Sequence, residues 1–225
     1  MRGTADTDPS APPGAERAGG GLAAADNETA RLEAFSDGVF AIAITLLVLD
    51  LKVPHGPDGA LGRELAAAWP SYVAFLASFA TIGIMWLNHH RLFRLIGRAD
   101  HGLMVANALL LLGITVVPFP TAVLSAHLGD PDARTAALLY AGTFVYIALA
   151  FNLLWRHASA VRQGRSLLVV PDDHPAVQEV HASFRVGPWS YMLMFALAAF
   201  VPLASVILAA ALAAFYARAP RAELP

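Results

Sequence analysis

The stretch RLEAFSDGVFAIAITLLVLDLKVP, residues 31–54, sets charged and hydroxyl side chains at the start of a long apolar run. As a helix, residues 35–53 are about 28 Å long at 1.5 Å per residue, close to the ~30 Å thickness of a membrane's hydrocarbon core. A charged side chain at membrane depth costs about 2.5 to 3.5 kcal/mol on insertion scales. Asp37, at the mouth of this span, is therefore a candidate functional residue.

The composition is typical of a membrane protein. Hydrophobic residues make up 57% of the 225 residues and charged residues only 14%, whereas about 25% of the residues in an average soluble domain are charged. The net charge of -2 argues against nucleic acid as a partner, and the absence of Cys excludes thiolate metal ligands and Cys nucleophiles. We predict an all-α polytopic membrane protein that uses no cofactor and no metal ion.

Further spans are predicted where uncharged stretches exceed the ~20 residues needed to cross a bilayer. The last of these stretches has 32 residues and is too long for one span. We expect Val201-Pro202 to divide it into helices over about 185–200 and 203–218, because Pro removes a backbone donor. Pro118 and Pro120 are expected to kink the third span. The uncharged stretches cover residues 65–90, 102–129, 135–155 and 186–217.

The predicted architecture is six transmembrane helices within residues 28–218, between a disordered tail over 1–27 and a C-terminal tail over 219–225. With six spans, twelve of the fifteen Lys and Arg residues lie on one side of the membrane. This bias predicts that both termini are cytoplasmic, and we expect the membrane to be a bacterial plasma membrane. The longest connection, residues 158–182, is expected to be a solvated loop without chemistry of its own.

One side of the first helix carries a mostly apolar stripe. With about 100° per residue and Gly38 at zero, its members fall within about 80° of Gly38, whereas Ser36 and Asp37 fall near 160° and 260°. We therefore expect Ser36 and Asp37 to hydrogen-bond to neighbouring helices rather than to share the role of the stripe. The stripe consists of Ile42, Thr45, Leu46 and Leu49.

Polar partners for these two residues are available on the next two spans. The alternative is that Ser36 or Asp37 simply caps the start of the helix, but Ala34 and Phe35 suit a helix that is already under way. A metal site at two adjacent His residues is disfavoured, since neighbours on a helix point ~100° apart. The candidate partners are Trp86, His89, His90 and Asn107.

RLEAFSD, followed by GVFAIAITLLVLDLKVP, resembles the RxxxFSD signature of the endolysosomal potassium channel family and its prokaryotic relatives. The later WLNHHRLF, residues 86–93, is similar to the second-helix pattern of that family. The resemblance covers Arg31 to about residue 217. Animal members carry two repeats, whereas this chain carries the motif once, so the resemblance implies a homotetramer around one pore.

The resemblance also implies roles for particular residues. The first helix would line the pore, with Ile42, Leu46 and Leu49 as a narrow hydrophobic ring and Thr45 as an added hydroxyl. The motif residues would lock this helix to its neighbours. Because no TVGYG-like loop is present, selectivity would come from this constriction rather than from rings of carbonyls. The motif residues are Arg31, Phe35, Ser36 and Asp37.

The resulting prediction is a passive, potassium-permeable cation channel in a lipid bilayer. The alternative is a secondary ion transporter, which usually needs a midplane site or paired intramembrane charges. Asp37 and Asp50 lie near the ends of the first span, and the other spans carry no Asp, Glu, Lys or Arg. An enzyme is not expected, because no GxSxG or HExxH spacing is present.

Overall fold

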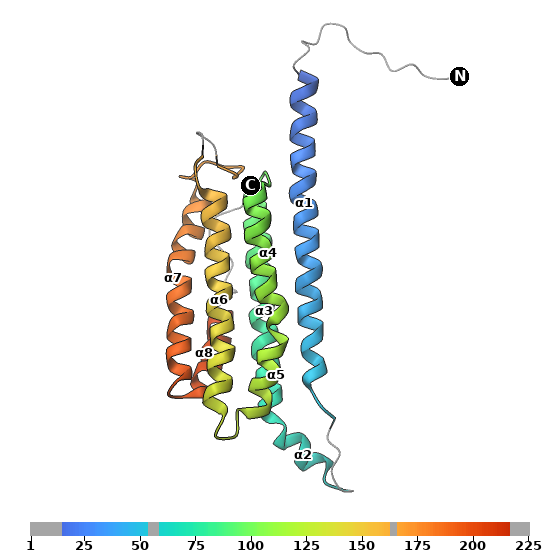
Figure 1. Cartoon of the computed structure of the whole chain (residues 1–225), viewed down its shortest axis with the longest axis vertical. Coiled ribbons are helices and arrows are strands. Elements are labelled where there is room, and N and C mark those ends of the chain that lie inside the picture. Colours follow the sequence, from blue (N-terminus) through green and yellow to red (C-terminus); the bar gives the residue numbers. More distant parts are fainter. Residues whose placement is uncertain (1–14, 54–58, 163–165, 217–225) are drawn as a thin grey trace, which may run out of the picture.

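The computed structural model describes residues 15–53, 59–162 and 166–216. Its helices run side by side in an elongated bundle with α1 at one edge (Figure 1). The elements are α1 (Ala15–Leu46), the short 3-10 helix η1 (Leu47–Asp50), α2 (Leu61–Ala67), α3 (Trp69–Leu95), α4 (His101–Val116), α5 (Pro118–His127), α6 (Ala133–Ser159), α7 (Pro175–Ala198) and α8 (Pro202–Tyr216).

Four helical segments of the described residues are long and apolar enough to cross a membrane. This confirms the prediction of an all-α polytopic membrane protein. α8 contributes a shorter apolar helix over Pro202–Phe215, and the expected count of six adds α7 and α8 to the four. The four segments are Glu28–Asp50, Trp69–Leu95, His101–His127 and Ala133–Ser159.

Proline residues divide the helices near the expected positions. α4 ends at Val116 and α5 begins at Pro118, with the Val117 N–H donating to the Ile114 carbonyl at 3.2 Å in a tighter turn. α7 ends at Ala198 and α8 begins at Pro202. Pro suits the first turn of a helix because its missing N–H would have no helical partner there.

Two boundaries differ from the sequence-based prediction. α7 begins at Pro175, inside the segment 158–182 that was expected to be a loop. Pro175 stands at the first turn, and the His174 side chain accepts a hydrogen bond from the Ala176 N–H at 3.2 Å, so the start is well capped despite its polar sequence. α1 begins at Ala15, inside the expected disordered tail, because each residue added to an existing helix gains a hydrogen bond. Residues 1–14 and 219–225 lie outside the described part.

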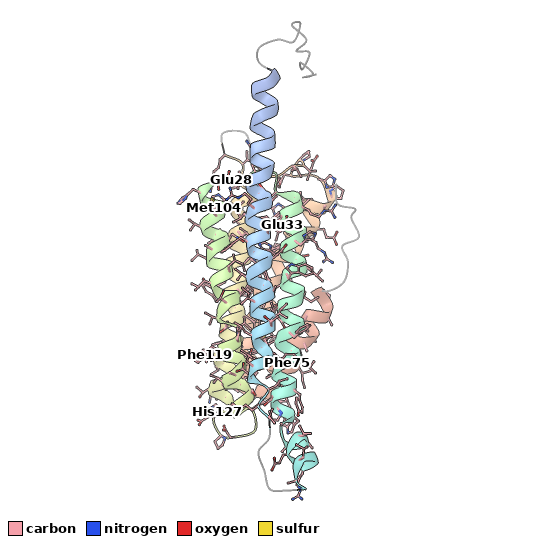
Figure 2. All side chains as sticks on the ribbon, turned by 90° about the vertical axis from the view of Figure 1, so that its right-hand side faces the viewer. Glu28, Glu33, Phe75, Met104, Phe119 and His127 are labelled. Carbon is pink, nitrogen blue, oxygen red and sulfur yellow. The ribbon has the colours of Figure 1, made fainter. Side chains whose placement is uncertain are left out.

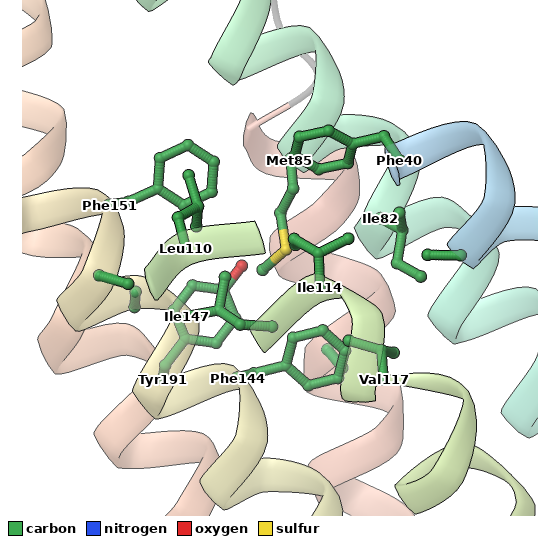
Figure 3. Close-up of a cluster of buried hydrophobic side chains, with 14 of the residues drawn as sticks. Phe40, Ile82, Met85, Leu110, Ile114, Val117, Phe144, Ile147, Phe151 and Tyr191 are labelled. Carbon is green, nitrogen blue, oxygen red and sulfur yellow. The ribbon is translucent and has the colours of Figure 1, made fainter. Parts of the chain in front are cut away.

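The core lies between the long helices. Buried side chains from α1, α3, α4, α6 and α7 meet in one cluster (Figure 3). α4 packs against α6 at Gly113, where a Cβ atom would collide with the side chains of Ile147 and Tyr146. The glycine therefore sets how closely these two helices approach.

α1 packs against α3 and α4. In Figure 2 it lies in front of these two helices, with its outer side uncovered. An edge position gives this helix two faces with different surroundings.

Candidate functional site

The inner face of α1 is buried against the bundle. Its residues follow the spacing of four, three and four that keeps side chains on one side of a helix. Phe40 and Ala43 of α1 and Leu47, the first residue of η1, are apolar and at most 2% exposed, and Ser36 is fully buried beside them. This face fixes how α1 is rotated relative to α3 and α4.

The outer face of α1 is apolar and uncovered within the single chain. This face continues into η1, and its large side chains are Phe35, Ile42 and Leu46 of α1 and Leu49 of η1, which are 65%, 61%, 41% and 72% exposed. Val48 of η1 is also 51% exposed. Gly38 and Thr45 are exposed between them. The Thr45 hydroxyl donates to the Ile42 carbonyl at 2.9 Å. The stripe predicted from the sequence is therefore one continuous surface that points away from the core.

A buried chain of hydrogen bonds joins α1 to α4 and α3. The Asn107 amide Nδ2 donates to Ser36 Oγ at 2.9 Å, and Ser36 Oγ donates to the Leu32 carbonyl at 2.8 Å. Asn107 Oδ1 then faces His89 Nε2 at 3.0 Å, so Nε2 carries the hydrogen. The His89 ring packs between Phe40 and Phe93, with centroids 5.4 and 4.3 Å away. All three polar side chains of this chain are at most 1% exposed.

A second, more exposed pair of contacts joins α1 to α3. The Trp86 indole N–H donates to Asp37 Oδ1 at 2.8 Å, and His90 Nδ1 lies 2.7 Å from Glu33 Oε1. The rings of Trp86 and His90 stack at 6.4 Å. Both partners on each helix are four residues apart, which places them on the same side of their helix. Ser36 and Asp37 therefore act in two separate contacts. Together these two sets of hydrogen bonds fix α1 to α3 and α4.

The structure brings together most of the residues expected to lock the first helix, with two differences. Arg31 and Phe35 are exposed. They lie near 20° and 60° on the helix wheel, which is the side of the outer face. Glu33 was missed as a locking residue, although its spacing of four from Asp37 matches the spacing between Trp86 and His90.

His89 and His90 do not converge on one point, because His89 is bound to Asn107 and His90 to Glu33. A different group, His127, Asp130 and Asp132, brings its ligand atoms within 4.8 Å at the turn after α5. Asp130 already accepts from His127 at 2.9 Å and from the Asp132 N–H at 2.8 Å. The pKa of the Asp130 carboxyl lies below its usual range, first because of the hydrogen bond from His127.

The fold and the two faces of α1 define the class. It is a polytopic helical membrane protein whose first helix is locked to the bundle by side-chain hydrogen bonds and carries a bare apolar face. A family model described as endosomal/lysosomal potassium channel TMEM175 matches residues 31–118. A potassium channel from Chamaesiphon minutus is 51% identical over 76% of this chain and 84% of its own. The chain belongs to the TMEM175 channel family, and the expectation that it is not an enzyme is thereby confirmed.

Further relatives support this membership. A potassium channel from Streptomyces collinus is 46% identical over 84% of this chain and 91% of its own. The human endosomal/lysosomal proton channel TMEM175 is 31% identical over 79% of this chain, which corresponds to 34% of the human protein. The crystal structure of a lysosomal potassium-selective channel TMEM175 homolog from Chamaesiphon minutus matches with a TM-score of 0.77 and 47% identity, covering 85% of this chain and 97% of that one.

Proposed function

We propose that this chain is one subunit of a homotetrameric potassium channel, in which the outer faces of four α1 helices surround the ion path. The observation that carries the proposal is the contrast between the two faces of α1. Its inner face is buried and hydrogen-bonded to α3 and α4, whereas Ile42 and Leu49 are 61% and 72% exposed on the opposite side. A helix held in this way can present a fixed apolar wall to three copies of itself.

The constriction in this proposal is formed by Ile42, Thr45, Leu46 and Leu49. Because the Thr45 hydroxyl donates to the Ile42 carbonyl, its oxygen lone pairs remain available to a cation. The apolar side chains of Ile42, Leu46 and Leu49, which flank Thr45 along the path, would strip part of the water from an ion. Such a filter discriminates modestly between potassium and sodium and can close by dewetting.

The proposed topology has six spans, with α7 and α8 crossing as the fifth and sixth. Both termini then lie in the cytoplasm of a bacterial cell whose plasma membrane holds the tetramer. Arg94 and Arg156 in the last turns of α3 and α6 support this orientation, because Arg and Lys are enriched on the cytoplasmic side of spans.

Flux measurements in proteoliposomes with opposed potassium and sodium gradients test the proposal. We expect a passive current that follows the electrochemical gradient and reverses nearer to the potassium potential. Flux strictly coupled to a second ion would instead support the secondary transporter. The same vesicles should carry a pH dye, because the human, bovine and rodent relatives are named proton channels.

Leu49→Ala and Ile44→Ala form a matched pair for the constriction. Leu49 is 72% exposed on the outer face, whereas Ile44 is partly buried against the core. Leu49→Ala should widen the path, raise sodium permeability and flatten selectivity. Ile44→Ala should lower stability and leave the reversal potential unchanged. The reverse pattern would assign the pore to another side of α1.

A further inference from the structure

The connection between α6 and α7 lies across one end of the bundle. We call its described residues, 160–162 and 166–174, the strap, and this end of the bundle the Asp100 end. The strap is fastened to the end of α3 and to the residues after it by an antiparallel bridge between Ile96 and Leu168. The hydrogen bonds at this bridge are Gly97 N–H to the Leu167 carbonyl at 2.9 Å, Val169 N–H to the Leu95 carbonyl at 2.9 Å, and Arg98 Nη2 to the Ser166 carbonyl at 2.9 Å.

His181, on α7, joins the far end of the strap to α6. Its Nδ1 accepts a hydrogen bond from the Trp155 indole N–H at 3.1 Å, and its Nε2 lies 3.1 Å from Asp172 Oδ1. An indole N–H can only donate and a carboxylate can only accept. This pair of contacts therefore requires a neutral ring with its hydrogen on Nε2. The Trp155 side chain is 1% exposed, so water does not replace His181 as its acceptor.

His157, on α6, forms a similar contact at the near end of the strap. Its Nε2 lies 2.8 and 3.0 Å from the two oxygens of Asp100, and Arg162 Nη1 lies 3.2 Å from both ring nitrogens. Because Nε2 carries its hydrogen toward the carboxylate, the free lone pair of the neutral ring is on Nδ1. This lone pair can accept a hydrogen bond from the guanidinium. A guanidinium also only donates. A neutral ring thus connects an anion from the α3–α4 connection with a cation from the strap.

Both rings respond to a proton in the same way. A proton added at Nδ1 turns this nitrogen into a donor and gives the ring a positive charge. Trp155 then loses its acceptor, and Arg162 faces a second cation at 3.2 Å. The contacts with Asp172 and Asp100 persist as ion pairs. Protonation therefore exchanges partners, releasing the indole and the guanidinium while keeping the carboxylates.

We propose that His157 and His181 are a proton-operated latch, which binds Arg162 and Trp155 when neutral and releases both when the side facing the Asp100 end is acidified. A backbone hydrogen bond from the Leu167 N–H to the Ala158 carbonyl, 3.1 Å long, keeps the strap on α6 in both states. Histidine is the residue type that ordinarily changes charge between about pH 5 and 8. The latch is independent of the proposed ion path, because none of its residues lies on the outer face of α1.

The charged groups around the two rings come from several elements. Asp100 from the α3–α4 connection and Arg162 from the strap face His157, with Arg156 beside it on α6. Asp172 from the strap faces His181, and Arg185 lies one turn further along α7. Each ring thus meets one carboxylate, and the His157 ring also meets the Arg162 guanidinium.

Asp100 remains an acceptor throughout the range in which the latch works. Partial burial alone would raise the pKa of the Asp100 carboxyl, but hydrogen bonds from the Leu103 N–H and from His157, with the nearby positive charges, lower this pKa below its ordinary value. Asp100 is therefore ionised above pH 5 and stays an acceptor for His157 there.

The test is NMR on the full chain in lipid nanodiscs, with 15N-labelled His and Trp, titrated from pH 8 to pH 5. The chain holds four Trp residues, and Trp155→Phe assigns the Trp155 indole signal. We expect His157 and His181 as Nε2–H tautomers at pH 8. Hydrogen exchange of the Trp155 indole N–H, corrected for intrinsic rates, should rise at least tenfold toward pH 5, with the midpoint at which His181 titrates.

His181→Gln and His127→Gln are the matched variants. Gln keeps one donor and one acceptor but does not titrate, so His181→Gln should abolish the response of Trp155. His127 pairs with Asp130 at the far end of α5, and His127→Gln should respond as the wild type. A Trp155 indole that does not change while His181 titrates overturns the proposal. So does an Nδ1–H tautomer at pH 8, or a response that persists in His181→Gln. The two wild-type readouts decide the matter if His181→Gln does not fold.

Discussion

At the residue scale, the buried chain from His89 through Asn107 to Ser36 is a directed set of hydrogen bonds. Each side chain donates to the next, and the last donor, Ser36, is satisfied by the Leu32 carbonyl. Removing one member leaves a buried partner without its bond. Such an orphaned group costs about 1 to 3 kcal/mol, whereas replacing both partners by apolar groups of similar shape costs much less.

We therefore predict that Asn107→Leu lowers the free energy of unfolding by about 1 to 3 kcal/mol per subunit, because His89 Nε2–H loses its buried acceptor. His89→Phe combined with Asn107→Leu should recover part of this loss. Thermal or denaturant unfolding in detergent measures both. Two additive losses would show that the His89 to Asn107 bond does not contribute in this way.

Asp100 gives a pH-dependent prediction. Because its pKa is lowered in the folded chain, its contribution to stability is fully present above its ordinary pKa and is lost as the pH falls toward the lowered one. Asp100→Asn should be less stable than the wild type at pH 6, with the difference shrinking as the pH falls below the ordinary pKa of 3.8. Asn still caps the start of α4. Melting temperatures of both proteins across this range measure the effect, and a constant difference contradicts it.

At the element scale, Pro188 lies inside α7 and has no N–H to offer the Phe184 carbonyl four residues earlier. The Asn152 side chain on α6 donates to that carbonyl at 2.9 Å. A side chain from a neighbouring helix is one way in which a membrane protein satisfies a backbone group freed by proline. The carbonyl left free by Pro188 in α7 is thereby bound to α6.

Asn152→Leu should lower the free energy of unfolding by roughly 0.5 to 2 kcal/mol, because it orphans the Phe184 carbonyl. In a Pro188→Ala background the restored N–H supplies that carbonyl, so the same substitution should cost less. A double-mutant cycle on unfolding measures this coupling. Equal costs in both backgrounds would mean that Asn152 acts elsewhere.

The sequence predicted the helix breaks better than the helix starts. Pro118 and Pro202 are visible breaks, because proline acts through local backbone geometry. The start of α7 at Pro175 was missed, since the polar residues of its first turns show no apolar run. Ser36 and Asp37 could be recognised from their place on the helix wheel. Glu33 could have been recognised from its spacing of four to Asp37, which matches the spacing of Trp86 to His90. Asn152 could not, because its partner is the backbone carbonyl of Phe184, 32 residues away.

At the scale of the whole molecule, one chain cannot enclose a path along α1, because the outer face of that helix is bare. A cyclic assembly closes such a face by repeating one contact around an axis. The proposal of four copies predicts that mass measurement in detergent gives four chains per particle. A stable, conducting monomer or trimer would contradict it.

The proposal that the outer face of α1 lines the ion path can be tested directly, because the chain contains no Cys. Ile42→Cys and Leu49→Cys place a thiol on this face. Leu76→Cys places one on α3, where Leu76 is 62% exposed, as Ile42 is 61% exposed. The measurement is potassium current through each variant before and after addition of Ag⁺, a small cation that binds the soft ligand sulfur. We expect Ag⁺ to block Ile42→Cys and Leu49→Cys and to leave Leu76→Cys unchanged. Block of Leu76→Cys alone would contradict the proposal.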